Sequence, residues 1–415
     1  MIKEARKGGV GITAERFILL IGALDTKGRF VEYLSQRLRE SGLEALIADV
    51  SLLPSGNSSA QIDQATICAE AGICVEDLSS LAQEDACAKV IEGLKKIVTR
   101  LYRESKIHGI IGFGGTMGTG ISTAVMRSLP LGIPKLVIST VRGDVRPYIG
   151  WSDITFFPAP VDFVGMNIFV RRTFDMAVSA IVGMTKLFDQ NPEHESKKTV
   201  AITVRGTTSR CAENLVFLLE EAGFQAVSFH AIGQGSLMEE LIRDGQICGV
   251  FDITPAEITE EVFGGKLSAG PQRMEAASLA GIPQVVSIGC TDIVCFGEVE
   301  SIPKRFKRTH RIRSHSPELS AVFLKKREFL KVLDVICEKL NRSFGPVAVL
   351  IPKRGTGSAG WTMPEEYIEL ATKTFRRKLK PDFQVLEVDT DINDITFAKV
   401  AFNTFMAMLN KYKEL

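Results

Sequence analysis

The stretch IHGIIGFGGTMGTG, residues 107–120, decides the fold class of this 415-residue chain. Its first half is a short, isoleucine-rich apolar run, typical of a buried β-strand. Its second half has five glycines in nine residues, Gly112 to Gly120, and the helical pattern STAVMRSL follows at once. A strand, a glycine-rich turn and a helix in this order are typical of proteins that alternate strands and helices around a parallel sheet.

The same alternation continues on both sides of this stretch. Amphipathic segments such as FVEYLSQRLRES, from residue 30, separate short apolar runs. The polar run DQNPEHESKK, residues 189–198, interrupts the pattern, which then restarts with TVAITV at residue 199. We therefore predict two doubly wound, mostly parallel-sheet (Rossmann-like) α/β domains, residues 1–188 and 199–415, with a linker at 189–198.

Composition excludes several classes of protein. Lys and Arg total 50 against 49 Asp and Glu, a balance that argues against a nucleic-acid or membrane-surface binder. The most apolar candidate segment, residues 176–187, contains Lys186 and is too short to span a bilayer, and no apolar segment of a secretory signal precedes Phe17. We expect a cytoplasmic protein with neither a membrane nor a nucleic acid as partner.

In open parallel sheets, ligands bind beyond the carboxyl ends of the strands. The glycine-rich loop lies there, and its bare amides with the positive end of the next helix could hold a phosphate. Met117 replaces the third glycine of a dinucleotide fingerprint, and no Gly-Lys-Ser/Thr follows. The alternative is that the glycines serve a tight turn and close packing.

Two further turns of the first domain are candidate nucleotide contacts. Asp25 could hold a ribose hydroxyl or a magnesium ion, and Thr26 and Lys27 could contact phosphate oxygens. Alternatively, Asp25 or Thr26 caps the next helix. Asp49 closes the second strand, where a ribose-binding carboxylate is found in Rossmann-like domains.

The second domain has a different set of polar residues after its strands. Carboxylate, imidazole and cationic groups together could bind an acidic metabolite or perform acid–base chemistry, although each residue alone could be a cap or an ion pair. These candidate catalytic residues are Arg205, His230, Asp252, Glu257 and Lys353.

One strongly basic stretch stands out, with seven cationic or imidazole side chains in the ten residues Lys304 to Arg313. It could bind RNA or a phosphate tail. Because the chain is nearly neutral overall and Phe306 is the only aromatic residue interleaved with the cations, we favour a solvated, partly mobile loop.

Several motifs together resemble a known family. They include GALDTKG at residue 22, GFGGTMGTG at 112, IPKLVISTV at 133, FHAIGQG at 229 and FGGKLSAGPQR at 263. In order and spacing they are similar to the ATP-binding domain family of the tomato mosaic virus resistance protein and its bacterial and fungal homologues, many of them uncharacterised.

This resemblance implies that the N-terminal domain binds ATP, with magnesium at Asp25 plausible, and that the protein is a homodimer. In the plant proteins a TIM-barrel domain follows, so a separate TIM-barrel protein is a candidate partner. With Asp49 from the argument above, the expected nucleotide contacts are Gly22, Asp25, Thr26, Lys27, Asp49, Gly112, Gly114, Gly115, Thr116, Gly118, Thr119, Ser139 and Thr140.

Two functions are therefore expected. The first is an ATP-dependent enzyme acting on a small acidic metabolite in the inter-domain cleft, with charge on the transferred phosphoryl group stabilised by backbone amides and Lys27. The alternative is a non-catalytic ATP-binding module that regulates or scaffolds a partner. An oxidoreductase using a dinucleotide is a third, weaker interpretation.

Overall fold

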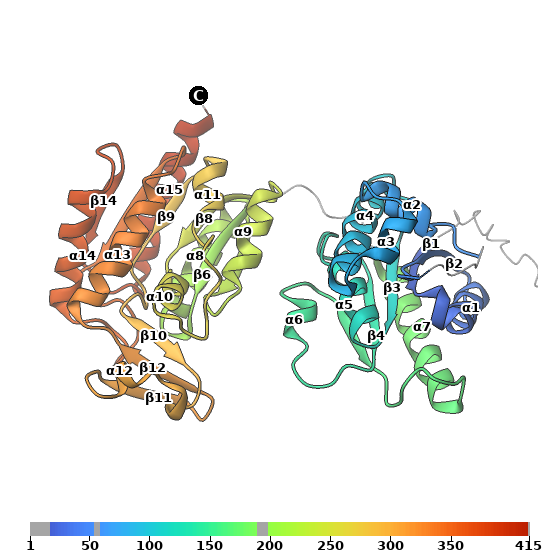
Figure 1. Ribbon diagram of the computed structural model, residues 1–415. Helices are drawn as coiled ribbons and strands as arrows, with labels where there is room; N and C mark the ends of the chain where they lie inside the picture. The colour runs from blue at the N-terminus through green and yellow to red at the C-terminus, as the bar shows by residue number, and fades with distance from the viewer. Residues whose placement is uncertain (1–16, 54–58, 189–197, 414–415) are drawn as a thin grey trace, which may run out of the picture. The chain divides into compact units, whose positions relative to one another are not determined.

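The computed structural model describes residues 17–53, 59–188 and 198–413. The chain divides into two compact units, Met1–His194 and Glu195–Leu415, and each is described by itself (Figure 1). Of the linker predicted at 189–198, residues 189–197 lie outside the described residues.

The N-terminal unit is built on a five-stranded sheet in the order β2-β1-β3-β4-β5, with every neighbouring pair parallel. The order reverses between β1 and β3, which is the switch point where ligands bind in sheets of this type. The strands are β1 (Phe17–Gly22), β2 (Glu44–Asp49), β3 (Gly109–Gly114), β4 (Lys135–Ser139) and β5 (Thr155–Pro158).

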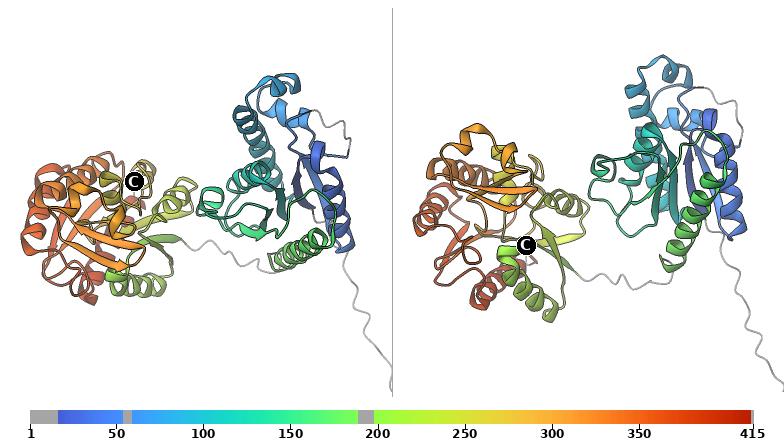
Figure 2. Two further views of the ribbon diagram at one scale, coloured as in Figure 1. Left: turned by 60° about the horizontal axis from the view of Figure 1, so that its bottom comes forward. Right: turned by 90° about the horizontal axis from the view of Figure 1, so that it is seen from below.

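Helices cover both faces of this sheet because its strands are apolar on both sides (Figure 2). Ile18 and Leu20 pack against α1 and α7, whereas Leu19 and Ile21 pack against α4 and α5 on the other face. The helices are α1 (Leu24–Glu40), α2 (Gln64–Glu70), α3 (Val75–Ser80), α4 (Gln83–Arg103), α5 (Thr116–Met126), α6 (Arg146–Ile149) and α7 (Ile168–Phe188).

The C-terminal unit has a six-stranded parallel sheet in the order β14-β13-β9-β8-β6-β7. Its order reverses between β6 and β8. The predicted fold class, two doubly wound parallel-sheet units, is confirmed. The strands are β6 (Thr199–Val204), β7 (Gln225–His230), β8 (Ile247–Asp252), β9 (Gln284–Val286), β13 (Val347–Pro352) and β14 (Gln384–Val388).

The helices of this unit also lie on both faces of the sheet. Residues of α8 and α15 pack in one core cluster, and those of α10, α13 and α14 pack in another. The helices are α8 (Ser209–Glu221), α9 (Gly235–Arg243), α10 (Ala256–Phe263), α11 (Ala276–Ala280), α12 (Lys304–Lys307), α13 (Lys326–Leu340), α14 (Glu365–Lys378) and α15 (Ile395–Lys413).

A small antiparallel sheet, which the sequence did not predict, is inserted between β9 and α13. It consists of β10 (Ile293–Phe296), β11 (Ile312–Ser316) and β12 (Leu319–Phe323), in the order β10-β12-β11. The expectation of a partly mobile basic loop is wrong, because the basic stretch forms α12 and the start of β11. Stacking orders two of its arginines: Arg305 lies 4.7 Å from the Phe306 ring centroid and Arg313 lies 4.2 Å from that of Trp361.

The glycine-rich stretch is only partly a loop. Helix α5 begins at Thr116, so the second half of the predicted loop is the first turn of a helix. A Cβ atom on Gly118 would lie 2.8 Å from the Phe113 carbonyl oxygen, and one on Gly112 would collide with the Ser122 hydroxyl. These two glycines allow α5 to pack closely on β3, the structural alternative considered above. Gly120 has open space beside it.

Replacing two glycines of α5 separates packing from helix propensity. We expect Gly118→Ala to lower the free energy of unfolding of the N-terminal unit by about 1–2 kcal/mol, because overpacking exceeds the gain in propensity. Gly120→Ala, the matched control, should raise it by roughly 0.5–1 kcal/mol. Urea unfolding in a Trp361→Phe background, where Trp151 alone reports, checks both; equal effects would contradict the packing role.

Candidate functional site

The first candidate site lies at the β1/β3 switch point of the N-terminal unit, where α5 begins. Gly115 is the N-cap residue of α5, and no side chain caps the helix. A Cβ atom on Gly115 would meet only the Thr140 hydroxyl, at 3.7 Å. The end of α5 is therefore open, and it presents the positive pole of a helix.

Residues of the neighbouring strand hold this end in place. The Thr140 amide donates to the Gly114 carbonyl oxygen at 3.1 Å. Beneath it, the buried hydroxyls of Thr119 and Ser139 are 2.7 Å apart and hydrogen-bonded to one another. The structure thus brings Gly114, Thr119, Ser139 and Thr140 together around the start of α5, with Gly115 and Thr116 at its tip.

The turn after β1 is arranged differently, because its amides are already bonded. The amide of Leu24 donates to the Asp49 carboxylate at 3.0 Å and that of Asp25 to the Ser51 hydroxyl at 3.0 Å. The amide of Thr26 donates to the Asp25 carboxylate at 2.7 Å. The Lys27 ammonium donates to the Phe163 carbonyl at 2.6 Å. Here Asp49 and Asp25 bind the first amides of α1; their roles toward ribose and metal stay predictions.

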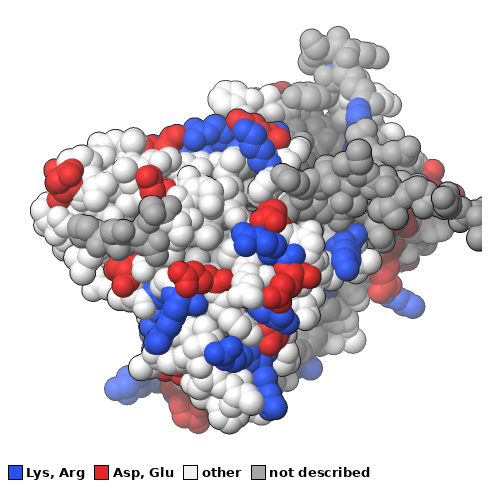
Figure 3. Space-filling model, turned by 90° about the vertical axis from the view of Figure 1, so that its right-hand side faces the viewer, with Lys and Arg blue, Asp and Glu red and all other residues white. Residues whose placement is uncertain are grey.

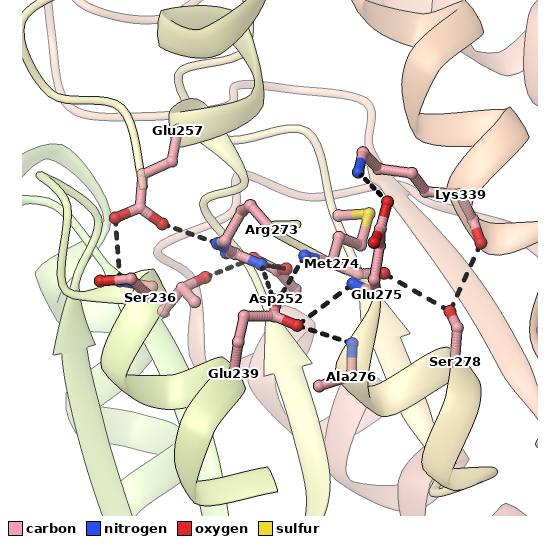
Figure 4. A network of polar contacts seen from close by, with 12 residues as sticks. Ser236, Glu239, Asp252, Glu257, Arg273, Met274, Glu275, Ala276, Ser278 and Lys339 are labelled. Atoms are coloured by element: carbon pink, nitrogen blue, oxygen red, sulfur yellow. Dashed lines mark hydrogen bonds and ion pairs between the residues drawn. The ribbon is translucent and has the colours of Figure 1, made fainter. Parts of the chain in front are cut away.

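The second candidate site is at the carboxyl edge of the C-terminal sheet, above a buried ion-pair network centred on Arg273. The Arg273 side chain is fully buried, and its Nη1 and Nη2 donate to the Asp252 carboxylate at 2.7 and 2.8 Å. Its Nε donates to Glu257 at 2.7 Å, and Glu239 lies 3.5 Å from Nη1 (Figure 4).

Each of these carboxylates also binds a further part of the chain. Glu257 accepts the amides of Gly233 and Gly235, and Asp252 accepts the Thr203 hydroxyl. Glu239 accepts the amides of Met274 and Ala276 at 2.6 and 2.7 Å, at the start of α11. Burial raises the pKa of Glu239, and Arg273 opposes that shift.

The network changes how the predicted residues are interpreted. Asp252 and Glu257 are candidate catalytic residues, but both are buried and bonded to Arg273, and neither lines the cavity described below. Lys353 is half exposed, and its ammonium lies 4.0 Å from the Glu387 carboxylate, which is not part of the network. Sequence reasoning missed Arg273 and Glu239, because neither directly follows a strand of the large sheet.

Glu257 binds the amide of Gly233, and the adjacent residue Ile232 lines a cavity of about 350 Å³. Of the predicted residues it brings together Arg205, after β6, and His230, at the end of β7. The small sheet contributes a wall that the sequence did not predict. The polar and aromatic lining residues are Arg205, Thr207, His230, Cys290, Cys295, His315, Ser358 and Trp361.

Arg205 is the charged group of this lining. Its Nη2 donates to the fully buried carboxylate of Glu260 at 2.9 Å, and its Nε donates to the Ala231 carbonyl at 2.8 Å. Burial raises the pKa of Glu260, while Arg205 acts in the opposite direction. Burial, and then the charge of Arg205, lower the pKa of His230, which favours the neutral ring.

Cys290 is a functional candidate that sequence reasoning missed. It has a φ of 56°, a left-handed backbone conformation rare for residues with a side chain and concentrated at functional sites. Its thiol is 3.0 Å from the Thr207 hydroxyl. Burial raises the pKa of this thiol, against the effect of Arg205. The signal available in sequence was Gly289-Cys290 directly after a buried strand.

Asp292, two residues further on, is a buried acid whose Oδ1 has no hydrogen-bond partner among the described residues. Burial raises the pKa of Asp292 from 3.8 to about 7. It does not line the cavity, but it is two residues away from Cys290, which does.

Two further observations concern the described residues as a whole. They contain no group of three or more His, Cys, Asp or Glu side chains that could hold a metal ion, and none of their helices has the length and apolar character needed to cross a membrane. On the face shown in Figure 3, acidic and basic side chains are interspersed, without the extended basic surface that nucleic acids bind.

The fold and sites define a two-unit α/β protein with parallel sheets and a ligand-sized cavity at the carboxyl edge of the second. Residues 16–190 match the N-terminal domain, and residues 197–409 the C-terminal domain, of the Uncharacterised protein family (UPF0261). The chain belongs to this family, which confirms the resemblance drawn from its motifs.

Its relatives include bacterial and plant proteins. A UPF0261 protein of Clostridium tetani is 35% identical over 405 residues, covering 95% of this chain and 99% of that protein. The ToMV susceptible protein tm-1(GCR26) of Solanum lycopersicum is 31% identical over 422 residues, covering 95% of this chain. This chain spans only 56% of that plant protein's length.

Removing the guanidinium of Arg273 should destabilise the C-terminal unit strongly. Arg273→Met keeps the volume but leaves three buried carboxylates without a cation, so we expect a loss of about 3–5 kcal/mol in the free energy of unfolding. Arg354→Met, which breaks the exposed pair with Asp389, is the control and should change almost nothing. Urea unfolding reported by Trp361 in a Trp151→Phe background measures both; a small effect of Arg273→Met would contradict the network's structural role.

Asp292 should make stability depend on pH. Its folded-state pKa is raised from 3.8 to about 7, so its contribution is fully present below pH 3.8 and is lost as pH rises through 7. Across these roughly three pH units the loss is about 4 kcal/mol. Asp292→Asn has no charge to bury, so its advantage over the wild type should grow from pH 4 to pH 8 in urea unfolding. A pH-independent difference would show that Asp292 is not the titrating group.

Proposed function

We propose that this protein binds ATP in its N-terminal unit, with the phosphates at the start of α5, and that it is an ATP-dependent enzyme acting on a small acidic metabolite. The observation that carries the nucleotide proposal is the open end of α5 at the switch point of the sheet. Gly115 has no side chain to cap the first amides of α5. Only the Thr140 hydroxyl would lie within 4 Å of a Cβ atom at this position. Free amides at a helix N-terminus are a general phosphate-binding arrangement.

The residues around the start of α5 have different roles in this proposal. Gly115, Thr116 and Thr140 are placed to contact the phosphates, while Gly112 and Gly118 act through packing. Asp25 would assist a magnesium ion held mainly by the phosphates, as is usual for Mg²⁺ with nucleotides. Lys27 would need to exchange its bond to the Phe163 carbonyl for a phosphate oxygen.

The C-terminal cavity supports the enzymatic part of the proposal. A buried arginine, a histidine and a cysteine with a left-handed backbone conformation line one space of about 350 Å³. This size falls at the lower end of the range for small-molecule pockets. In this proposal Arg205 and His230 contact the metabolite, and Asp252 and Glu257 position the loops beneath it through Arg273.

A non-catalytic ATP-binding module is the second candidate. The observation that favours it is length: this chain matches 56% of the tomato protein, so the remainder of that protein could act with the module. A homodimer and a separate TIM-barrel partner belong to this proposal. ATP binding without turnover in any mixture of acidic metabolites would favour the module over the enzyme.

A negative charge at the start of α5 should weaken ATP binding without unfolding the unit. Gly115→Asp fits the open space and supplies a favourable N-cap, so stability should be unchanged or higher. The added carboxylate repels phosphate, and ATP affinity should fall at least about tenfold in calorimetric titration with Mg²⁺.

Gly183→Asp adds the same charge to α7, at a glycine that also has open space beside it, and is the matched control. It should bind ATP like the wild type. An unchanged affinity of Gly115→Asp would refute phosphate binding at this helix, and no ATP binding by the wild type would refute the nucleotide proposal as a whole.

A further inference from the structure

We infer that the C-terminal cavity is a binding site for a small carboxylic acid with a mainly apolar body, whose carboxylate binds at Arg205. The inference deepens the proposed function by assigning the class and place of the second ligand. It rests on the geometry of the C-terminal unit alone and does not require a nucleotide.

The lining of the cavity suits such a molecule. Apolar side chains form much of its wall, and among the residues that the structure describes no Asp or Glu lines it. Its polar lining consists of a guanidinium, two imidazoles, two thiols and hydroxyls, so the ligand's acceptor atoms find donors. The apolar residues are Ile232, Leu267, Ile293, Leu319 and Ala321, from four different segments.

Arg205 retains donors for a ligand. A guanidinium has five N–H groups, and the contacts of Arg205 engage three of them: Nε with Ala231, one on Nη2 with Glu260, and one on Nη1 with the Cys295 sulfur at 3.8 Å. One N–H on each terminal nitrogen therefore has no partner among the described residues. Two such N–H groups on adjacent nitrogens match the oxygens of a carboxylate.

Arg313 supplies positive charge in addition to that of Arg205. Glu260 neutralises Arg205 from behind the cavity, so a ligand carboxylate needs further positive potential. Arg313 stacks on Trp361, a lining residue, and donates to the Gly360 carbonyl at 2.9 Å. No acidic side chain pairs with it in the described part of the chain. The basic stretch thus contributes positive charge beside the cavity.

Cys290 lies in the lining and provides a chemical reporter of this selectivity. Iodoacetate and iodoacetamide alkylate thiolates by the same step: sulfur attacks the methylene carbon, the carbon–iodine bond breaks, and iodide leaves. The reagents are nearly equal in size, but only iodoacetate carries a carboxylate. Their relative rates at Cys290 therefore measure how strongly the cavity prefers a carboxylate over a neutral amide.

The experiment compares the two alkylation rates at Cys290 by peptide mass spectrometry at pH 8.5, without nucleotide. The reference is the same cysteine in the urea-unfolded chain, which gives the intrinsic ratio. We expect the iodoacetate-to-iodoacetamide ratio to be at least fivefold higher in the folded protein. Millimolar benzoate should slow the folded-state reaction, whereas benzamide at the same concentration should not.

Two variants identify the groups responsible. Arg313→Gln, on an exposed side chain, should lower the folded-state ratio about threefold, and Arg354→Gln, an exposed arginine paired with Asp389, should leave it unchanged. A folded-state ratio equal to that of the unfolded chain would overturn the inference. So would a Cys290 that neither reagent reaches in the time that labels the exposed Cys74 completely, since the cavity would then be closed to small acids.

This outcome is separable from that of the nucleotide proposal. ATP titration of the Gly115→Asp variant reports only on the N-terminal unit, and alkylation of Cys290 only on the C-terminal unit. A result that contradicts the nucleotide proposal therefore does not affect the carboxylate inference, and the converse also holds.

Discussion

The bonds of Arg273 to three buried carboxylates are the constraint on which the C-terminal site depends. One guanidinium links the end of β8 through Asp252, the start of α10 through Glu257, and α9 through Glu239. Burying charges costs free energy unless they are paired, so the loops that Arg273 joins have few alternative conformations. Asp252 and Glu257, two of the residues that sequence patterns assign to catalysis, are therefore bonded within this buried network.

The two units use glycine in different ways at the carboxyl edges of their sheets. In the N-terminal unit, Gly112 and Gly118 allow α5 to lie against β3, and Gly115 leaves the helix end open. In the C-terminal unit, Gly289 passes close to the Ile253 carbonyl, and the following Cys290 takes the left-handed conformation. One sheet edge thus presents backbone amides, which suit phosphate, and the other presents side chains, which suit an organic acid.

The inserted small sheet forms part of the wall of the C-terminal cavity. Residues of β10, β11 and β12 line one side of it, opposite the loops after β6 and β7. The basic stretch forms part of this insertion, where aromatic rings order its arginines. A stretch that looks like a solvated loop by composition is structured here, with rings supplied by Phe306 within it, Phe323 in the paired strand and the more distant Trp361.

The sequence by itself determined the alternation of strands and helices, the two parallel sheets and the positions after strands where polar residues gather, since periodicity and glycine turns are local properties. It also identified Arg205 and His230, which the structure places in one cavity. Tertiary structure alone decided that Asp252 and Glu257 are buried, that Arg273 pairs with them, and that Cys290 faces the same space. Those facts depend on contacts between segments that are far apart in the sequence, and local sequence patterns do not predict such contacts.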